Sequence, residues 1–169
     1  QGVLGIEKML TANEKKDPMI FFGVSLLTSG YNGKDVRIML EDTLESTFQR
    51  DMVRADILAS MAAFCPAFGM IGTLVGLVIM FEKMGSDISA IGRGMALALL
   101  TTLYGVLITQ LFLKPASEKV RQRLEIYRFR NLLIMEGLAM IADGKDSLTI
   151  QDRLNSFMDP KVRFKVAQG

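Results

Sequence analysis

Two long uncharged segments constrain this 169-residue chain more than any other feature. No Asp, Glu, Lys or Arg occurs in residues 57–81 or in residues 94–113. Each segment reaches the roughly 20 apolar residues that a helix needs to cross a bilayer core of about 30 Å. The intervening residues 82–93 are too few for a domain, so the two segments are predicted to form a transmembrane hairpin. The alternative is a buried hairpin in a soluble all-α domain, which would leave little polar surface to cover both segments.

Basic residues are concentrated just beyond the second segment. They are Lys114, Lys119, Arg121, Arg123, Arg128 and Arg130. The charges of residues 82–93 cancel, so the positive-inside rule predicts that this loop is periplasmic and that residues 1–56 and 114–169 are cytoplasmic. The basic residues therefore indicate membrane topology and contact with lipid headgroups. They give no support to nucleic-acid binding.

The cytoplasmic parts carry helical patterns. Helices are expected at residues 2–10, 19–29, 115–142 and 147–158, and a long helix is expected to run from residue 34 into the membrane. Gly30 and Gly144 follow the ends of two of these helices and are predicted to terminate them. The predicted fold class is an all-α integral membrane protein with two transmembrane helices, extended by cytoplasmic helices.

The composition excludes several kinds of chemistry. The chain has no histidine, and Cys65 is its only cysteine. Zinc-type metal sites, a Ser-His-Asp triad and structural disulfides are therefore not expected. Glycine-rich phosphate loops between a strand and a helix are also absent from the pattern. We expect neither an enzyme nor a bound cofactor.

Small residues and hydroxyls recur at helical spacing within both uncharged segments. The first segment contributes Pro66, Gly69, Gly72, Thr73 and Gly76, and the second contributes Gly94, Ala98, Thr101, Thr102, Gly105 and Thr109. In a membrane such a stripe packs closely against another helix or lines an ion path. We expect the stripe, and Gly69, Gly72, Gly76, Ala98 and Gly105 in particular, to form a face on which a partner helix packs or slides.

The three threonines Thr73, Thr101 and Thr102 are expected to lie at one depth. With a rise of about 1.5 Å per residue, they lie roughly 3 to 6 Å outward of the centres of their segments. They could line a wet path or coordinate a cation. Alternatively, each hydroxyl bonds to the backbone of its own helix four residues earlier. Carriers of protons or sodium normally need an ionisable group at this depth, so a carboxylate must come from another chain or from outside this sequence.

Pro66 lies inside the first uncharged segment. Because proline has no amide hydrogen, the carbonyl of Ala62 loses its donor within the helix. We expect this carbonyl to offer an acceptor to water and the helix to bend there.

These motifs resemble those of a known family. The stretches PAFGMIGTLVGLV and GMALALLTTLYG are similar to the third and fourth membrane helices of the MotA/PomA family, the ion-driven stator subunits of the bacterial flagellar motor. GVLGIEKML, SGYNGKDVRIMLE and LLIMEGLAMIADGKDSLTIQDRLNSFM resemble the cytoplasmic parts of that family. The resemblance covers nearly the whole chain, and the first two of the family's four membrane helices are absent from it.

The resemblance implies an ion-conducting stator subunit in the bacterial inner membrane, multi-pass and with cytoplasmic domains. It implies a homo-pentamer around a MotB/PomB-type partner whose membrane aspartate binds the ion. The cytoplasmic part would contact the rotor protein FliG. An ExbB/TolQ-type motor subunit that energises outer-membrane processes is the nearest alternative, and a passive scaffold in which the glycines only pack helices is another.

Individual residues match the family's motifs. The resemblance implies that Pro66 and Pro115 are the prolines that couple ion passage to movement. It implies that Thr73 and Thr102, with Thr101 adjacent, are the hydroxyls beside the partner's aspartate, and that Glu7 is a rotor contact. Hydroxyls at the positions of Thr73 and Thr102 resemble the pattern of the family's sodium-type members. The resemblance therefore favours sodium over the proton as the transported cation.

The chain also departs from the family's pattern. Arg93 stands where the family more often has the second proline of the outer loop, and Cys65 precedes Pro66 where alanine is usual. These departures concern the outer rim and leave the coupling residues intact.

Overall fold

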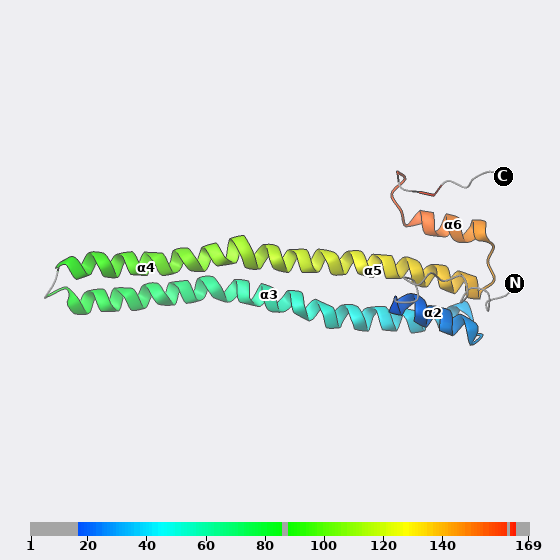
Figure 1. Ribbon diagram of the computed structural model, residues 1–169, viewed down its shortest axis with the longest axis horizontal. Coiled ribbons are helices and arrows are strands. Elements are labelled where there is room, and N and C mark those ends of the chain that lie inside the picture. The colour runs from blue at the N-terminus through cyan, green and yellow to red at the C-terminus, as the bar shows by residue number, and fades with distance from the viewer. Residues whose placement is uncertain (1–16, 86–87, 162, 165–169) are drawn as a thin grey trace. The chain divides into compact units, whose positions relative to one another are not determined.

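Helices make up almost all of the part of the chain that the structure describes. The computed structural model describes residues 17–85, 88–161 and 163–164. The helices are α2 (Pro18–Thr28), α3 (Gly33–Lys83), α4 (Ile88–Ile108), a π-helical turn η2 (Thr109–Leu113), α5 (Lys114–Ala142) and α6 (Ser147–Ser156) (Figure 1). No strand occurs among these described residues, and two helices are long and apolar enough to cross a membrane. The predicted all-α class is confirmed.

The connection within the hairpin is shorter than expected. We expected a loop over residues 82–93, but α3 continues to Lys83 and α4 already begins at Ile88. A helix satisfies its own backbone hydrogen bonds, so it can continue past the apolar segment into a polar environment. The helix predicted for residues 2–10 lies outside the described residues.

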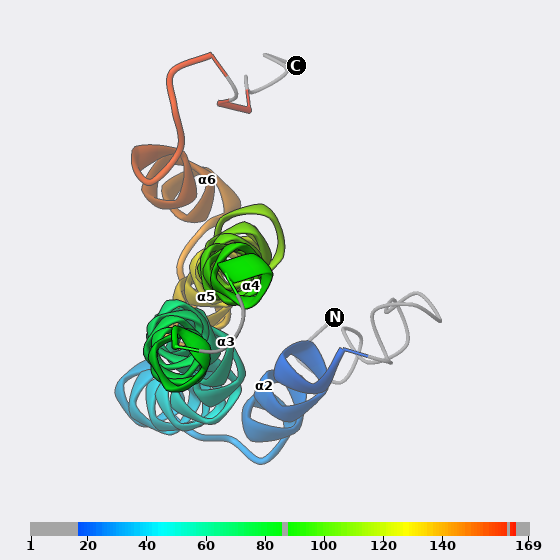
Figure 2. The same cartoon turned by 90° about the vertical axis from the view of Figure 1, so that its left-hand side faces the viewer.

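The chain divides into two compact units, residues 1–49 with 125–169 and residues 50–124. The first unit has a core formed by α2, the start of α3 and the end of α5. It is called here the cytoplasmic unit, after the location that the charge pattern predicts. Its buried side chains are Met19, Val24, Leu26, Leu27, Val36, Leu40, Leu44, Met135 and Leu138. In the end-on view of Figure 2, α2 lies beside α3, and α6 lies beside α5. Val36, Leu40 and Leu44 recur at helical spacing along α3, so their side chains share the face that packs on this core.

The ends of the cytoplasmic helices follow local rules. Asp17 caps α2 by accepting hydrogen bonds from the amides of Met19 and Ile20 at 3.0 and 3.4 Å. Gly30 and Gly144 have φ angles of 80° and 67°, which favour glycine. Both glycines therefore terminate helices in the way that the sequence predicts.

Ion pairs between arginines and carboxylates join the helices of the cytoplasmic unit. The Asp17 carboxylate forms an ion pair with the guanidinium of Arg130 in α5, with 2.6 Å between nitrogen and oxygen. The buried carboxylate of Glu136 accepts from Arg37 of α3 at 3.0 Å and from Arg153 of α6 at 3.0 Å. Because α6 contributes no fully buried side chain, the Glu136–Arg153 pair is an important attachment of this helix.

The start of α6 is predicted to be sensitive to acid. Asp146 caps this helix through hydrogen bonds from the Thr149 hydroxyl at 2.6 Å and the Thr149 amide at 3.0 Å. These bonds favour the carboxylate and lower the pKa of Asp146 below its ordinary value of 3.8. A depressed folded-state pKa stabilises the helix above pH 3.8, and this contribution is lost as the pH falls through the lowered pKa.

We therefore expect the Thr149 amide to exchange its hydrogen faster as the solution is acidified through this range. Asp146→Ala should give fast exchange at every pH. Asp152→Ala, which removes an exposed carboxylate further along α6, should leave the pH dependence in place. An unchanged exchange rate for Asp146→Ala would contradict the capping role.

Candidate functional site

The two helices of the hairpin approach each other through glycine. A Cβ atom added at Gly76 would lie 2.8 Å from the Cβ of Ala98, and one added at Gly105 would lie 2.8 Å from the carbonyl oxygen of Cys65. A Cβ at Gly69 would lie 3.1 Å from the Cα of Thr102. Backbones this close leave no room for larger side chains. Figure 1 shows α3 and α4 side by side and antiparallel.

The small-residue stripes of the two segments therefore face each other within one chain. Gly72 belongs to the same surface, since a Cβ there would lie 2.8 Å from the Thr101 hydroxyl. Close packing inside the hairpin accounts for these glycines by itself. That the same residues form a sliding face for a partner helix remains a prediction.

The hydroxyls of Thr73, Thr101 and Thr102, called here the threonine cluster, lie together between α3 and α4. The hydroxyls of Thr73 and Thr102 are hydrogen-bonded to each other. All three hydroxyls lie near the carbonyl oxygen of Gly69, with Thr73 at 3.1 Å, Thr102 at 3.2 Å and Thr101 at 3.4 Å. The structure therefore brings together the three residues that the matched depth singled out.

The expectation that each hydroxyl bonds to the backbone of its own helix holds only in part. Thr73 contacts the carbonyl four residues before it, at Gly69, and Thr101 donates to Ala98 of its own helix at 2.8 Å. Thr102 instead bonds across to α3. Each hydroxyl has one proton and several acceptors within reach, so the donors of the cluster can exchange partners.

The cluster presents only neutral oxygen atoms, from hydroxyls and a backbone carbonyl. Hydroxyl and carbonyl oxygens are ligands of the kind that hard cations prefer. The cluster itself contains no ionisable group, and no group of acidic, cysteine or histidine residues that could hold a metal occurs among the described residues. Neutral oxygens leave the charge of a cation uncompensated, so a nearby carboxylate would strengthen its binding to such a set.

A second polar contact lies at the level of Pro66. The carbonyl of Ala62, which Pro66 deprives of its helical donor, accepts a hydrogen bond from the Thr109 hydroxyl at 3.2 Å. Thr109 is 2% exposed. A side chain from beyond α4 thus supplies a donor to this carbonyl. That the carbonyl also accepts from water stays a prediction, since a carbonyl oxygen has two lone pairs. The sequence signal for the pairing of Thr109 with Ala62 is that Thr109 follows Thr102 by seven residues, or about two helical turns.

Pro115 lies further along the chain and does not join the threonine cluster. It follows η2, in which the amide of Lys114 donates to the carbonyl of Thr109, five residues earlier. Two residues later the buried Ser117 hydroxyl donates to the carbonyl of Ala55 at 2.9 Å. A pocket of about 420 Å³ lies at this level, lined by Ala59, Ala62, Ala63, Lys114, Ser117 and Glu118.

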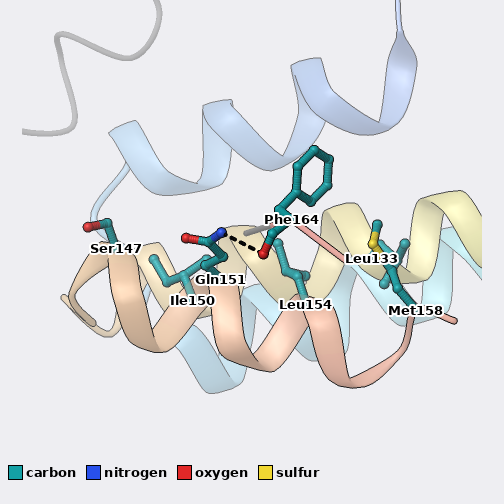
Figure 3. A pocket seen from close by; sticks show the side chains of 7 residues that line it. All are labelled: Leu133, Ser147, Ile150, Gln151, Leu154, Met158 and Phe164. Carbon is teal, nitrogen blue, oxygen red and sulfur yellow. Dashed lines mark hydrogen bonds between the residues drawn. The ribbon is translucent and has the colours of Figure 1, made fainter. Parts of the chain in front are cut away.

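The cytoplasmic unit carries a separate groove between α5 and α6. Figure 3 shows the residues that line its volume of about 480 Å³, namely Leu133, Ser147, Ile150, Gln151, Leu154, Met158 and Phe164. The Gln151 amide donates to the carbonyl of Phe164 at 3.1 Å. The lining is mostly apolar and offers no ionisable group. The predicted rotor contact Glu7 lies outside the described residues.

Sequence comparison relates this chain to motility proteins. The chain is 34% identical over 162 residues to the chemotaxis protein PomA of Vibrio alginolyticus, covering 96% of this chain and 62% of PomA. It is 32% identical over 163 residues to motility protein A of Borreliella burgdorferi, covering 96% of this chain and 62% of that protein. The chain thus spans about three fifths of the length of these relatives.

Structural comparison gives the same fold. The flagellar MotAB stator complex of Bacillus subtilis contains a chain that superimposes with a TM-score of 0.85 at 20% sequence identity, covering 99% of this chain and 65% of that chain. The MotA/TolQ/ExbB proton channel family matches residues 11–130, and this family consists of channel subunits rather than enzymes. The uncharged hairpin, the threonine cluster and this match over most of the chain lead to one conclusion: the chain belongs to the MotA/TolQ/ExbB proton channel family.

Proposed function

We propose that the protein containing this chain is an ion-conducting stator subunit of the bacterial flagellar motor. It resides in the inner membrane, and its cytoplasmic unit contacts FliG of the rotor. The observation that carries the proposal is the threonine cluster, which gathers cation ligands at one depth but lacks a carboxylate of its own. A MotB/PomB-type partner would supply that carboxylate, and five copies of the subunit would surround the partner dimer.

The transported cation is proposed to be sodium. Thr73 and Thr102 contact each other from opposite helices, and both lie near the carbonyl of Gly69. This arrangement favours a cation that takes several neutral oxygens as ligands. A proton needs one acceptor with a suitable pKa, so it draws less benefit from such a cluster.

Swimming speed tests both the function and the ion. The gene for the protein and the gene for its partner are expressed together in a strain that lacks its own stator. We expect restored swimming whose speed rises with sodium concentration at fixed pH. Thr73→Ala should raise the sodium concentration for half-maximal speed by on the order of tenfold, as expected for the loss of one ion ligand.

Thr43→Ala is the matched control for this experiment. Thr43 lies in the same helix, and its hydroxyl also bonds to the carbonyl four residues earlier, at 2.8 Å from Met39. The control should leave the sodium dependence unchanged. Unchanged sodium dependence for Thr73→Ala would rule out contact between this hydroxyl and the ion, and speed that follows pH but not sodium would identify the proton.

An ExbB/TolQ-type motor subunit is the second candidate, because the matched family includes those proteins. It would share the hairpin and the partner carboxylate but would energise an outer-membrane process. Copurification of the protein with FliG supports the flagellar role, whereas copurification with a TonB-like protein supports the alternative.

A further inference from the structure

Hydroxyl-to-carbonyl hydrogen bonds cross the hairpin at several levels. Three of them, donated by Thr102, Thr109 and Ser117, recur along the hairpin and are called here the hydroxyl ladder. The Thr102 hydroxyl donates to the carbonyl oxygen of Gly69 at 3.2 Å, and the Thr109 hydroxyl donates to the carbonyl oxygen of Ala62 at 3.2 Å. The third bond joins Ser117 to Ala55 at 2.9 Å. Thr109 and Ser117 are buried, so water does not compete freely for these two bonds.

The spacing of the ladder explains the π-helical turn. The three acceptors Gly69, Ala62 and Ala55 are seven residues apart along α3, which is two helical turns. The donors are seven residues apart from Thr102 to Thr109 but eight residues apart from Thr109 to Ser117. A π-helical turn accommodates one extra residue, and η2 begins at Thr109. Without it, an alanine rather than Ser117 would face Ala55.

The ladder opposes sliding of α3 along α4. Packing at Gly76 and Gly105 already favours one register, because a larger residue brought to either position would clash with the facing helix. The ladder adds directional hydrogen bonds to this preference. A shift by one residue would separate all three donors from their acceptors. In an apolar environment each separated carbonyl loses a hydrogen bond that water cannot replace.

We propose that Thr109 is a positioning residue that holds the hairpin in one register, so that the two helices move together when the stator works. The inference rests on the proposed function and adds a role for a residue outside the threonine cluster. Pro66 makes the bond necessary, because the carbonyl of Ala62 has lost its helical donor. The same proline would then act through Thr109 rather than through flexibility of α3.

A double-mutant cycle tests the pairing of Thr109 with Ala62. Thr109→Val removes the hydroxyl and keeps the side-chain volume, whereas Thr109→Ser keeps the hydroxyl. Pro66→Ala restores an amide that can donate to Ala62 within α3. The protein is purified in complex with its MotB/PomB-type partner and titrated with a denaturing detergent. Unfolding of the complex is followed by the circular dichroism of its helices.

Thr109→Val is expected to change the unfolding equilibrium constant by about threefold, the average effect of an interhelical hydrogen bond in a membrane. Thr109→Ser should change it less. In the Pro66→Ala background Thr109→Val should have little effect, because the carbonyl then has another donor. Equal effects of Thr109→Val in both backgrounds would overturn the pairing.

Motility provides the second readout. Thr109→Val should lower the maximal swimming speed without shifting the half-saturating sodium concentration, because the residue positions helices and does not contact the ion. Thr109→Ser should restore most of the speed. A shifted half-saturation would overturn the positioning role and place Thr109 on the ion path. If the wild-type protein fails to restore swimming while the unfolding cycle shows coupling, the proposed function fails and the pairing of Thr109 with Ala62 stands.

Discussion

Gly105→Ala is expected to destabilise the hairpin by about 1–3 kcal/mol and to abolish swimming, although it adds a single methyl group. The new Cβ would lie 2.8 Å from the carbonyl oxygen of Cys65 and 3.4 Å from the Cα of Gly69. Both atoms belong to the backbone, so no side-chain rotation relieves the clash. The helices must separate, and separation also lengthens the ladder bonds of Thr102 and Thr109.

Gly92→Ala is the matched control in the same helix. Apart from its chain neighbours and the backbone of its own helix, no heavy atom of the described residues lies within 4 Å of a Cβ at this position. Because alanine favours a helix over glycine, the control should leave the complex as stable as the wild type or more stable by up to about 1 kcal/mol. Unfolding of the purified complex and swimming speed are compared for the two variants. Equal stability of Gly105→Ala and Gly92→Ala would contradict the close approach of α3 and α4.

Glu136→Ala is expected to destabilise the cytoplasmic unit by about 2 kcal/mol and to release α6. The carboxylate is 7% exposed and accepts from two arginines, Arg37 and Arg153. Hydrogen bonds to charged groups contribute about 1.5–3 kcal/mol, and both arginines are half exposed, so water recovers part of the loss. Because α6 has no fully buried side chain, we expect it to detach before the core of α2, α3 and α5 unfolds.

Hydrogen exchange measures this release helix by helix. Glu136→Ala should accelerate exchange throughout α6 and leave α2 protected. Glu45→Ala is the control, since Glu45 also pairs with an arginine, Arg128 at 2.9 Å, but its side chain is 45% exposed, compared with 9% for the side chain of Glu136. Water screens this more exposed pair, so the variant should lie much closer to the wild type. Protection of α6 in Glu136→Ala would show that the apolar contacts of Ile150 and Leu154 suffice to hold it.

Much of the fold could be predicted from local patterns. The uncharged segments predicted the two long helices, and Gly30 and Gly144 predicted two helix ends. These features depend on the side chains of consecutive residues, which the sequence states directly. The length of the loop was overestimated, because charged residues mark the end of an apolar segment and not the end of a helix.

The threonine cluster was predictable for a related reason. Thr73, Thr101 and Thr102 occupy one depth because each helix rises uniformly along the chain. Their contacts were less predictable, since a threonine hydroxyl reaches both its own helix and the facing one. Only the separation of the two backbones decides between those acceptors, and Gly69 and Gly105 set that separation.

The amino-acid sequence by itself determined the helical class, the apolar hairpin and the depth of its hydroxyls, because these follow from the order of residues along each helix. The tertiary structure decided the register between the helices. It paired Thr109 with the carbonyl that Pro66 leaves without a donor, and it placed Ser117 opposite Ala55 through a π-helical turn. A shift of one residue in register changes every facing pair while leaving each helix's own periodicity almost unchanged, so only the packed hairpin reveals which hydroxyl meets which carbonyl.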